Sequence, residues 1–329
     1  MKSINYIDLF CGAGGLSLGF EQAGLKNIFS NDSDRVFAET YSKNFPKHNL
    51  LIKKIEDISN IEIKNLVKNK QIDILAGGPP CQGFSIAGNI GRKFQDDPRN
   101  YLFREFMRFV KILNPKIVLI ENVERLHKNE KIKNEITYTL NDFGYRVESK
   151  ILNTSQYSIP QVRRRVFFIA SRVSKHIIFP KKNMNTLTIK DAINDLPKIQ
   201  SGESSNIPNH IAMNHTEQML EKMSFISDGG SREQIPTQIR PKSGDVRKYI
   251  KFNSNKPSIC ITGDMRKVFH YSQNRALTVR ELARIQTFPD DFIFFGPSIS
   301  QQQQVGNAVP PLLAKKISKC LIKMLNESK

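Results

Sequence analysis

Cysteine is scarce in this chain and follows no pattern. The 329 residues contain four cysteines, which are scattered at Cys11, Cys81, Cys260 and Cys320. This spacing matches neither a disulfide framework nor the ligand set of a structural zinc site. We therefore expect a protein of a reducing, cytosolic compartment with no metal ion.

Long apolar runs are also absent. Hydrophobic residues make up 39% of the chain and the mean hydropathy is -0.40, with no stretch long enough to span a bilayer. The start, Met1–Asp8, places an acid where a signal peptide would have its apolar core. We expect neither an export signal nor an association with membranes.

Acidic residues are few relative to basic ones. The chain has 31 Asp and Glu against 50 Lys and Arg, a formal net charge of +19 and a pI near 9.8. Such an excess favours a polyanionic partner such as nucleic acid, because each neutralised phosphate releases counterions. The alternative is that the source organism has a lysine-rich proteome, so that the positive charge serves only to keep the surface soluble.

The first part of the chain alternates short apolar runs with amphipathic stretches. This order predicts βα units, and hence an α/β fold with a doubly wound, mostly parallel sheet. The expected strands are residues 4–10, 26–30, 72–76, 117–121, 146–152 and 166–170, and the expected helices are residues 16–23, 35–44 and 103–113. Residues 1–170 are predicted to form this first domain.

The amino-acid composition changes between residues 171 and 275. This segment is richer in Asn, Ser, Gly and Pro, and its 17 Lys and Arg against nine Asp and Glu give a net charge of +8. We expect a smaller, loop-rich second domain with short strands such as Ser258–Thr262. Residues 276–329 are expected to return to the first domain, ending in a helix over Ala314–Leu325.

One cysteine lies in an unusual setting. Cys81 follows the two prolines of the stretch Gly77–Ser85, directly after an apolar strand. The prolines fix the backbone and remove two N–H donors, and the glycines permit a sharp turn. A thiol held at a strand exit is well placed to act as a nucleophile. Taken alone, the pattern favours a buried structural cysteine beside a turn, and only the rest of the chain favours the nucleophile.

Three further patterns fall at predicted strand ends. A glycine-rich turn, Gly12–Gly15, follows the first strand, and Asp32 follows the second, an arrangement that suits the ribose and adenine of a nucleotide-like cofactor. Glu121 ends another strand, where it would either share a pocket with Cys81 or cap the next helix. In Gln161–Arg165, alternate side chains would share one face of an extended segment; a solvated basic edge is the alternative.

Together these motifs resemble those of the DNA (cytosine-5) methyltransferases of bacterial restriction–modification systems. The resemblance covers almost the whole chain, with the motifs in the family's order. They are DLFCGAGG at residues 8–15, EDI at 56–58, GGPPCQGFS at 77–85, ENV at 121–123, QVRRR at 161–165, RALTVRELARIQTFPDDF at 275–292 and QQVGNAVPP at 303–311.

This resemblance implies a mechanism and a set of site residues. Cys81 would add to C6 of a flipped-out cytosine, Glu121 would be protonated against N3 and the exocyclic amine, and Arg165 would hold O2. Gln161 and Arg163 would support that site. Cys81→Ser would then lose methylation but keep DNA binding, and Arg165→Ala would lose turnover more than cofactor affinity. The cofactor would be S-adenosylmethionine, cradled by Phe10, Gly12, Gly14, Gly15, Asp32, Asp57, Ile58, Pro79, Leu102 and Asn307. Where the family often has an aromatic residue over the adenine, this chain has Ser33.

The same resemblance implies double-stranded DNA as the partner. Residues 1–170 would be the catalytic and cofactor-binding domain, and residues 171–275 the target-recognition domain. Candidate DNA contacts are Ser85, Arg92, Arg99, Arg232, Gln234, Gln238, Arg240 and Arg266. A monomer on DNA is expected, in the bacterial cytoplasm and at the nucleoid when bound. A cognate restriction endonuclease that acts separately is a further candidate partner. An RNA-directed cytosine-5 methyltransferase and a catalytically silent DNA-binding relative are the alternatives.

Overall fold

The computed structural model describes residues 3–68, 70–80, 101–183, 185–241 and 248–327. The chain forms two compact units. Unit 1 consists of Met1–Asn153, Arg164–Lys181 and Pro311–Lys329, and unit 2 of Thr154–Arg163 and Lys182–Pro310. The unit boundaries thus fall at other points than the segments expected from composition. Residues 171–181 pack with unit 1, and residues 276–310 pack with unit 2.

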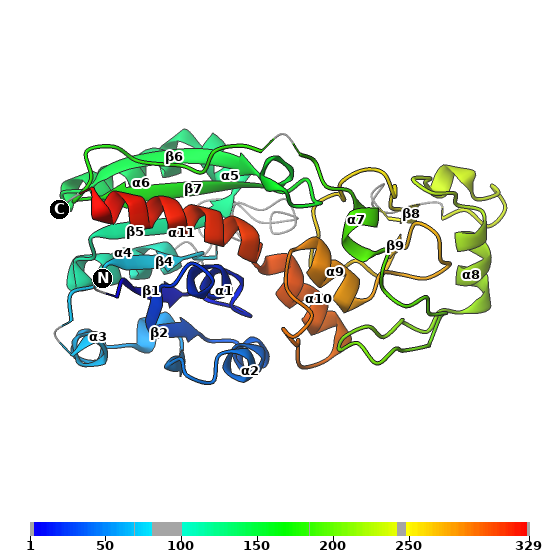
Figure 1. Ribbon diagram of the computed structural model, residues 1–329, viewed down its shortest axis with the longest axis horizontal. Coiled ribbons are helices and arrows are strands. Elements are labelled where there is room, and N and C mark those ends of the chain that lie inside the picture. Colours follow the sequence, from blue (N-terminus) through cyan, green and yellow to red (C-terminus); the bar gives the residue numbers. More distant parts are fainter. Residues whose placement is uncertain (1–2, 69, 81–100, 184, 242–247, 328–329) are drawn as a thin grey trace. The chain divides into compact units, whose positions relative to one another are not determined.

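Unit 1 is built on a seven-stranded sheet in the order β3-β2-β1-β4-β5-β7-β6 (Figure 1). Strands β1 to β5 pair in parallel, whereas β7 pairs antiparallel with both β5 and β6. The strands are β1 (Asn5–Leu9), β2 (Lys26–Asp32), β3 (Leu50–Ile52), β4 (Ile74–Gly77), β5 (Ile117–Val123), β6 (Arg146–Asn153) and β7 (Arg164–Ser171). The prediction of a doubly wound, mostly parallel sheet is confirmed.

Helices connect and cover these strands. They are α1 (Gly15–Glu21), α2 (Arg35–Asn44), α3 (Asn60–Val67), α4 (Tyr101–Leu113), α5 (Glu124–Lys128), α6 (Glu130–Asp142) and the C-terminal α11 (Pro311–Asn326), which packs against α1. Helix α2 starts at Asp34, whose carboxylate accepts hydrogen bonds from the backbone N–H of Val36 and Phe37. On α4, Phe106, Phe109, Val110 and Leu113 recur at helical spacing and enter the main core of the unit.

Unit 2 has little regular structure. Its elements are α7 (Ile189–Ile193), α8 (Glu217–Ser224), β8 (Ile250–Lys251), β9 (Val268–Phe269), α9 (Val279–Ile285) and α10 (Ser298–Asn307). Strands β8 and β9 are parallel, and Phe269 joins Met223, Ile226 and Ile235 in a small core.

The strand expected at Ser258–Thr262 is not formed. Only Ser258 makes a bridge, in parallel with Gln161. The backbone of Ser258 bonds to Pro160 and Val162, and the N–H of Ile261 donates to the side chain of Gln161. Because side-chain and loop partners take these groups, no ladder continues along the segment.

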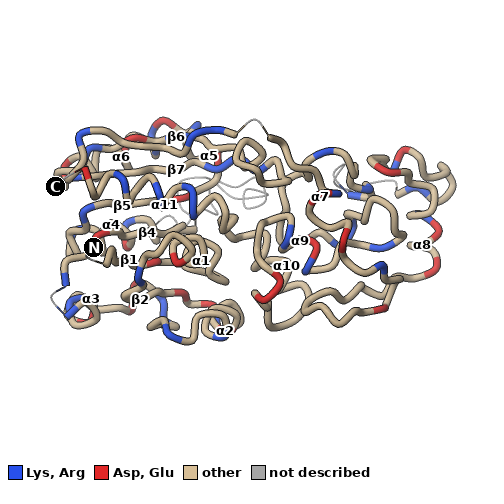
Figure 2. The backbone as a smooth tube through the Cα atoms, in the orientation of Figure 1, with Lys and Arg blue, Asp and Glu red and all other residues tan. Residues whose placement is uncertain are grey.

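Charged residues lie in both units (Figure 2). No described helix is long and apolar enough to cross a membrane. Within the described ranges, no group of three or more His, Cys, Asp or Glu could hold a metal ion.

Candidate active site and DNA-reading surface

The order of the sheet changes direction between β1 and β4, since β2 lies on one side of β1 and β5 lies beyond β4. In doubly wound sheets, ligands bind at the carboxyl ends of the strands flanking such a switch point. The glycine-rich turn occupies this position after β1. Gly14 is the N-cap of α1 and has a φ of 99°. Because a side chain would strain this left-handed conformation, the position favours glycine.

Asp32 ties this turn to the end of β2. Its Oδ2 accepts from the N–H of Gly12 at 2.8 Å, and its Oδ1 accepts from the N–H of Asp34 at 2.9 Å. Burial raises the pKa of Asp32, opposed by these hydrogen bonds. Ser33 beside it is exposed. The carboxylate therefore shapes the loop that would receive a nucleotide-like ligand.

The other cofactor candidates belong to both units, with Phe10, Asp57, Ile58 and Leu102 in unit 1 and Asn307 in unit 2. Phe10 and Leu102 are half-buried and pack against the core of the unit. Asp57 is exposed, whereas the side chain of Ile58 is buried, so Ile58 could meet a ligand only through its backbone. Asn307 ends α10 in unit 2 and is exposed.

The residues that follow β4 contact the end of β5. The amide of Asn122 donates to the carbonyl of Pro79 at 2.9 Å, and a Cβ added to Gly78 would lie 3.1 Å from Oε2 of Glu121. The backbone of this loop therefore lies against Glu121 at Gly78 and is bonded to Asn122 at Pro79. Cys81 itself lies outside the described residues, as do Ser85, Arg92 and Arg99.

Glu121 and Arg165 face one another from β5 and β7. The Nε of Arg165 lies 3.2 Å from Oε1 of Glu121, and their side chains are 19% and 13% exposed. Glu121 is not a helix cap, because the N-cap of α5 is Val123. The carboxyl group of Glu121 and the guanidinium of Arg165 thus lie together beside the Gly78–Pro79 loop, in a corner of unit 1 that is largely shielded from solvent.

Gln161 and Arg163 are not a solvated basic edge, because both side chains are buried in unit 2. The amide of Gln161 donates to Oε1 of Gln286 at 2.8 Å and accepts from the N–H of Ile261 at 2.9 Å. Arg163 donates from Nη1 to the carbonyl of Ile261 at 3.1 Å. Both side chains hold the segment around Cys260–Ile261. No local pattern in the sequence indicates the partner Gln286, which lies 125 residues further along the chain.

Each candidate DNA contact of unit 2 has a hydrogen-bond or ion-pair partner within that unit. Arg232 and Arg240 both pair with Glu233, and Gln234 bonds with Ser227. Gln238 is exposed and accepts a long hydrogen bond from Thr237. Arg266 is exposed and pairs with Asp264, an acid that sequence analysis missed.

The whole chain matches known methyltransferases. Residues 4–323 match the model of the C-5 cytosine-specific DNA methylases. The chain belongs to this family. It is 53% identical over 325 residues to the Type II methyltransferase M1.HphI of Haemophilus parahaemolyticus, covering 98% of this chain and 87% of that protein. It is 34% identical to the Type II methyltransferase M.DdeI of Desulfomicrobium norvegicum, covering 99% of this chain and 91% of that protein.

A solved structure agrees with this assignment. A prophage-encoded chain from E. coli, described as a DNA modification methyltransferase, superposes with a TM-score of 0.80 at 28% identity, covering 98% of this chain and all of the other. The chain is therefore a DNA (cytosine-5-)-methyltransferase that uses S-adenosylmethionine as its methyl donor and DNA as its substrate.

The DNA methylase motif at residues 8–15 also contains a buried acid. Asp8 accepts from the hydroxyl of Ser17 at 2.6 Å, and Ser17 contacts Tyr41, which reaches Nδ1 of His48. Burial raises the pKa of Asp8 to about 7, and the nearby Asp32 adds to this effect. Asp8 is thus the end of a polar chain that begins near the surface.

We expect Asp8→Asn to gain stability relative to the native protein as pH rises. A folded pKa above the unfolded value means that ionised Asp8 opposes folding, with no cost below about pH 4 and the full cost above about pH 7. At about 1.4 kcal/mol per pKa unit, the difference in unfolding free energy should grow by on the order of 4 kcal/mol across that window. Urea denaturation at several pH values measures it, and a pH-independent difference would contradict the assignment.

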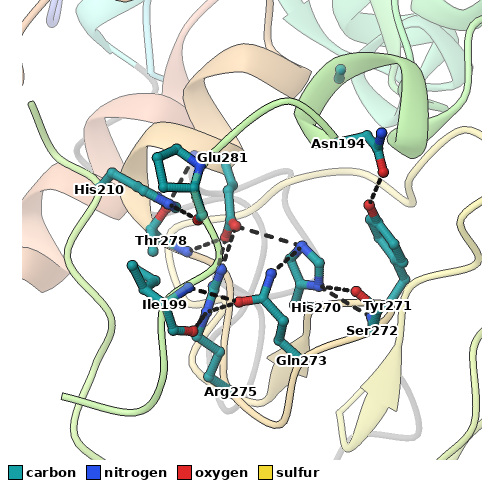
Figure 3. Close-up of polar contacts among 12 residues, drawn as sticks. Asn194, Ile199, His210, His270, Tyr271, Ser272, Gln273, Arg275, Thr278 and Glu281 are labelled. Atoms are coloured by element: carbon teal, nitrogen blue, oxygen red, sulfur yellow. Dashed lines mark hydrogen bonds and ion pairs between the residues drawn. The ribbon is translucent and has the colours of Figure 1, made fainter. Parts of the chain in front are cut away.

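The family motif RALTVREL folds into a buried network in unit 2 (Figure 3). Arg275 forms a bidentate pair with Glu281, through Nη1 at 2.9 Å and Nη2 at 2.6 Å. Glu281 also accepts from the N–H of Thr278 and completes the capping box of α9. Burial alone would raise the pKa of Glu281, but the hydrogen bonds and charge of Arg275 hold it below its usual value. Burial lowers the pKa of the neighbouring His270 to about 4.

Glu281→Gln is expected to lower the free energy of unfolding by about 3–5 kcal/mol, because Arg275 would remain buried without a counter-charge. Thermal or urea denaturation measures the loss. The matched control is Glu233→Gln in the same unit, where the side chain is 66% exposed, and a change of at most about 1 kcal/mol is expected. Equal effects of the two substitutions would contradict the structural role of the pair.

Proposed function

We propose that this chain is the modification enzyme of a restriction–modification system. It methylates one cytosine within a short double-stranded sequence and acts as a monomer, separately from a cognate restriction endonuclease. Two relatives that cover most of its length are named Type II methyltransferases. A DNA substrate supports a location in the bacterial cytoplasm, at the nucleoid when bound, and the net charge of +19 favours such binding.

The observation that carries the assignment of roles is the corner formed by Glu121 and Arg165, beside the loop that leads to Cys81. A cytosine entering this corner would replace the contact between the two side chains. Glu121 would then donate a proton to N3 and accept from the exocyclic amine, while Arg165 would bond O2. Gln161 and Arg163 would support the site by fixing the segment around Ile261.

Addition of the thiol to the base activates C5 for methyl transfer. The thiolate of Cys81 forms a bond to C6 of cytosine, the C5–C6 π electrons shift to the C4–C5 bond, and N3 takes the proton of Glu121. C5 becomes enamine-like and takes the methyl group, whose bond to the sulfonium sulfur breaks and leaves S-adenosylhomocysteine. A base or water then removes the C5 proton, those electrons restore the C5–C6 double bond as the bond between C6 and the sulfur of Cys81 breaks, and N3 returns its proton to Glu121. The target cytosine must leave the helix for this chemistry, because C5 and C6 are inaccessible within the stack.

The residues at the switch point fit the cofactor. S-adenosylmethionine supplies an electrophilic methyl group when bound. The Gly12, Gly14 and Gly15 turn would let the backbone approach it, Asp32 would accept from its ribose, and Phe10 would contact its adenine. Asp57 and the backbone of Ile58 would read the adenine edge. Pro79, Leu102 and Asn307 would complete the cradle.

DNA contacts are proposed for the basic and polar candidates. Most of them would bind phosphate, which positions the duplex without reading its sequence. The set is Ser85, Arg92, Arg99, Arg232, Gln234, Gln238, Arg240 and Arg266.

Bisulfite sequencing of DNA from a host that lacks cytosine methylation, with and without this chain, tests the proposed function. We expect methylated cytosines in one short sequence context only. An unmethylated genome in cells that contain the soluble protein would overturn the proposal, and methylated cytosines in cellular RNA would instead support an RNA-directed enzyme.

A further inference from the structure

Arg266 differs from Arg240 because a carboxylate holds one edge of its guanidinium and leaves Nη1 without a hydrogen-bond partner among the described residues. All three guanidinium nitrogens of Arg240, by contrast, donate within unit 2. Asp264 accepts from Nε of Arg266 at 2.9 Å and from Nη2 at 3.3 Å. These two nitrogens form one edge of the planar group, and Nη1 with the second N–H of Nη2 forms the other. Among the residues that the structure describes, none accepts from Nη1. The side chain is 44% exposed, so this second edge is available to a ligand.

Asp264 remains ionised while it is bonded to the forked guanidinium of Arg266. The hydrogen bonds of Arg266 hold the pKa of Asp264 well below its usual range, and Lys248 adds to the effect from 3.1 Å. The carboxylate therefore offsets part of the charge of Arg266 while fixing its orientation. A fixed fork with reduced charge loses Coulombic attraction for phosphate but keeps its hydrogen-bonding geometry.

The loop that carries Asp264 and Arg266 is held by contacts with α10. Met265 is buried, and its N–H donates to Oε1 of Gln302 on α10 at 3.1 Å. A Cβ added to Gly306 would lie 2.5 Å from the carbonyl carbon of Thr262, so α10 and the loop are in backbone contact. This support reduces the conformational freedom that binding would otherwise have to remove.

Two lysines flank the fork at the amino ends of β8 and β9. Ile250 pairs with Val268, and the N–H of Tyr249 donates to the carbonyl of Lys267, which brings Lys248 beside Arg266. The ammonium of Lys267 lies 5.1 Å from the centre of the Tyr249 ring. A lysine ammonium is a point charge on a flexible stem, which suits the phosphates flanking the base that a fixed guanidinium would read.

The competing candidates are committed to contacts within unit 2. All three guanidinium nitrogens of Arg240 donate internally, to the side chain and carbonyl of Glu233 and to the carbonyl of Ile235. Gln234 is bonded to the backbone and hydroxyl of Ser227. Binding DNA through either side chain would first break these bonds.

We propose that Arg266 reads one guanine of the recognition sequence through N7 and O6 in the major groove, and that Asp264 is its positioning residue. Guanine offers two uncharged acceptors in one plane, which match the outer edge of the guanidinium. The proposal rests on the proposed DNA methylation and adds the base that one residue recognises.

The test replaces each guanine of the mapped recognition sequence, one at a time, by 7-deazaguanine, which lacks the N7 acceptor. Methylation by the native enzyme should slow by about 5- to 150-fold at one position read by Arg266. Arg266→Ala should lose the penalty at that position and keep the penalties elsewhere. Arg266→Lys should reduce that penalty, because an ammonium can still donate to N7 but lacks the fixed fork. Asp264→Asn should also reduce it. Arg240→Ala is the matched control and should keep every position-specific penalty, whatever its overall rate.

Unchanged penalties in active Arg266→Ala and Arg266→Lys enzymes would overturn this proposal and leave the methyltransferase function intact. A uniform loss of rate on all duplexes, with a smaller salt dependence, would assign Arg266 to phosphate and overturn it as well. If the native enzyme methylates no cytosine in DNA, the proposed function fails, and this proposal fails with it.

Discussion

Replacing Cys81 by serine is expected to abolish methyl transfer, by roughly four orders of magnitude or more, and to change DNA affinity by less than about threefold. A serine hydroxyl is far less ionised and less nucleophilic than a thiol, so the addition to C6 that activates C5 would be lost. Transfer of a labelled methyl group to a substrate duplex measures the rate, and fluorescence anisotropy measures the binding.

Cys320→Ser is the matched control. This cysteine lies on α11, and burial raises the pKa of its thiol, which disfavours the thiolate that a nucleophile needs. Full activity is expected of the control. If Cys81→Ser methylates DNA as fast as Cys320→Ser, the covalent mechanism is wrong for this chain.

The second large effect is expected from Arg165→Ala, which should lower kcat by about 10²–10³-fold and change the KM for S-adenosylmethionine by less than about threefold. Arg165 lies 3.2 Å from Glu121 and is proposed to bond the cytosine, where charge develops during the reaction. It has no proposed contact with the cofactor. Steady-state kinetics with each substrate varied in turn separate the two effects.

Arg164→Ala provides the comparison within the same strand. Arg164 is 53% exposed and pairs with Glu124, so its loss should have little effect on kcat. Similar losses in the two variants would show that β7 needs its arginines only for general charge or folding. A raised KM for the cofactor in Arg165→Ala would move that residue out of the cytosine site.

Local sequence signals predicted much of unit 1. The helix expected at residues 35–44 is α2, and the closing helix expected at Ala314–Leu325 is α11 with a few residues added at its ends. Such elements follow from hydrophobic spacing and caps that lie within the element. Unit 2 was harder to predict, because its short strands and loops depend on partners far along the chain. The segment Ser258–Thr262 has the composition of a strand, but its partners are Gln161 and the backbone next to it.

The sequence by itself determined the family, the fold class and the identity of the side chains that chemistry requires, because these depend on residue types in a fixed order. Only the tertiary structure decided which of those side chains meet. It placed Glu121 against Arg165, bonded Gln161 to Gln286 and fixed Arg266 on Asp264. It also committed Arg240 to Glu233, although Arg240 and Arg266 look equivalent in the sequence. The physical reason is that a guanidinium pairs with an acceptor that the folded chain brings close to it. Spacing along the sequence does not identify that acceptor.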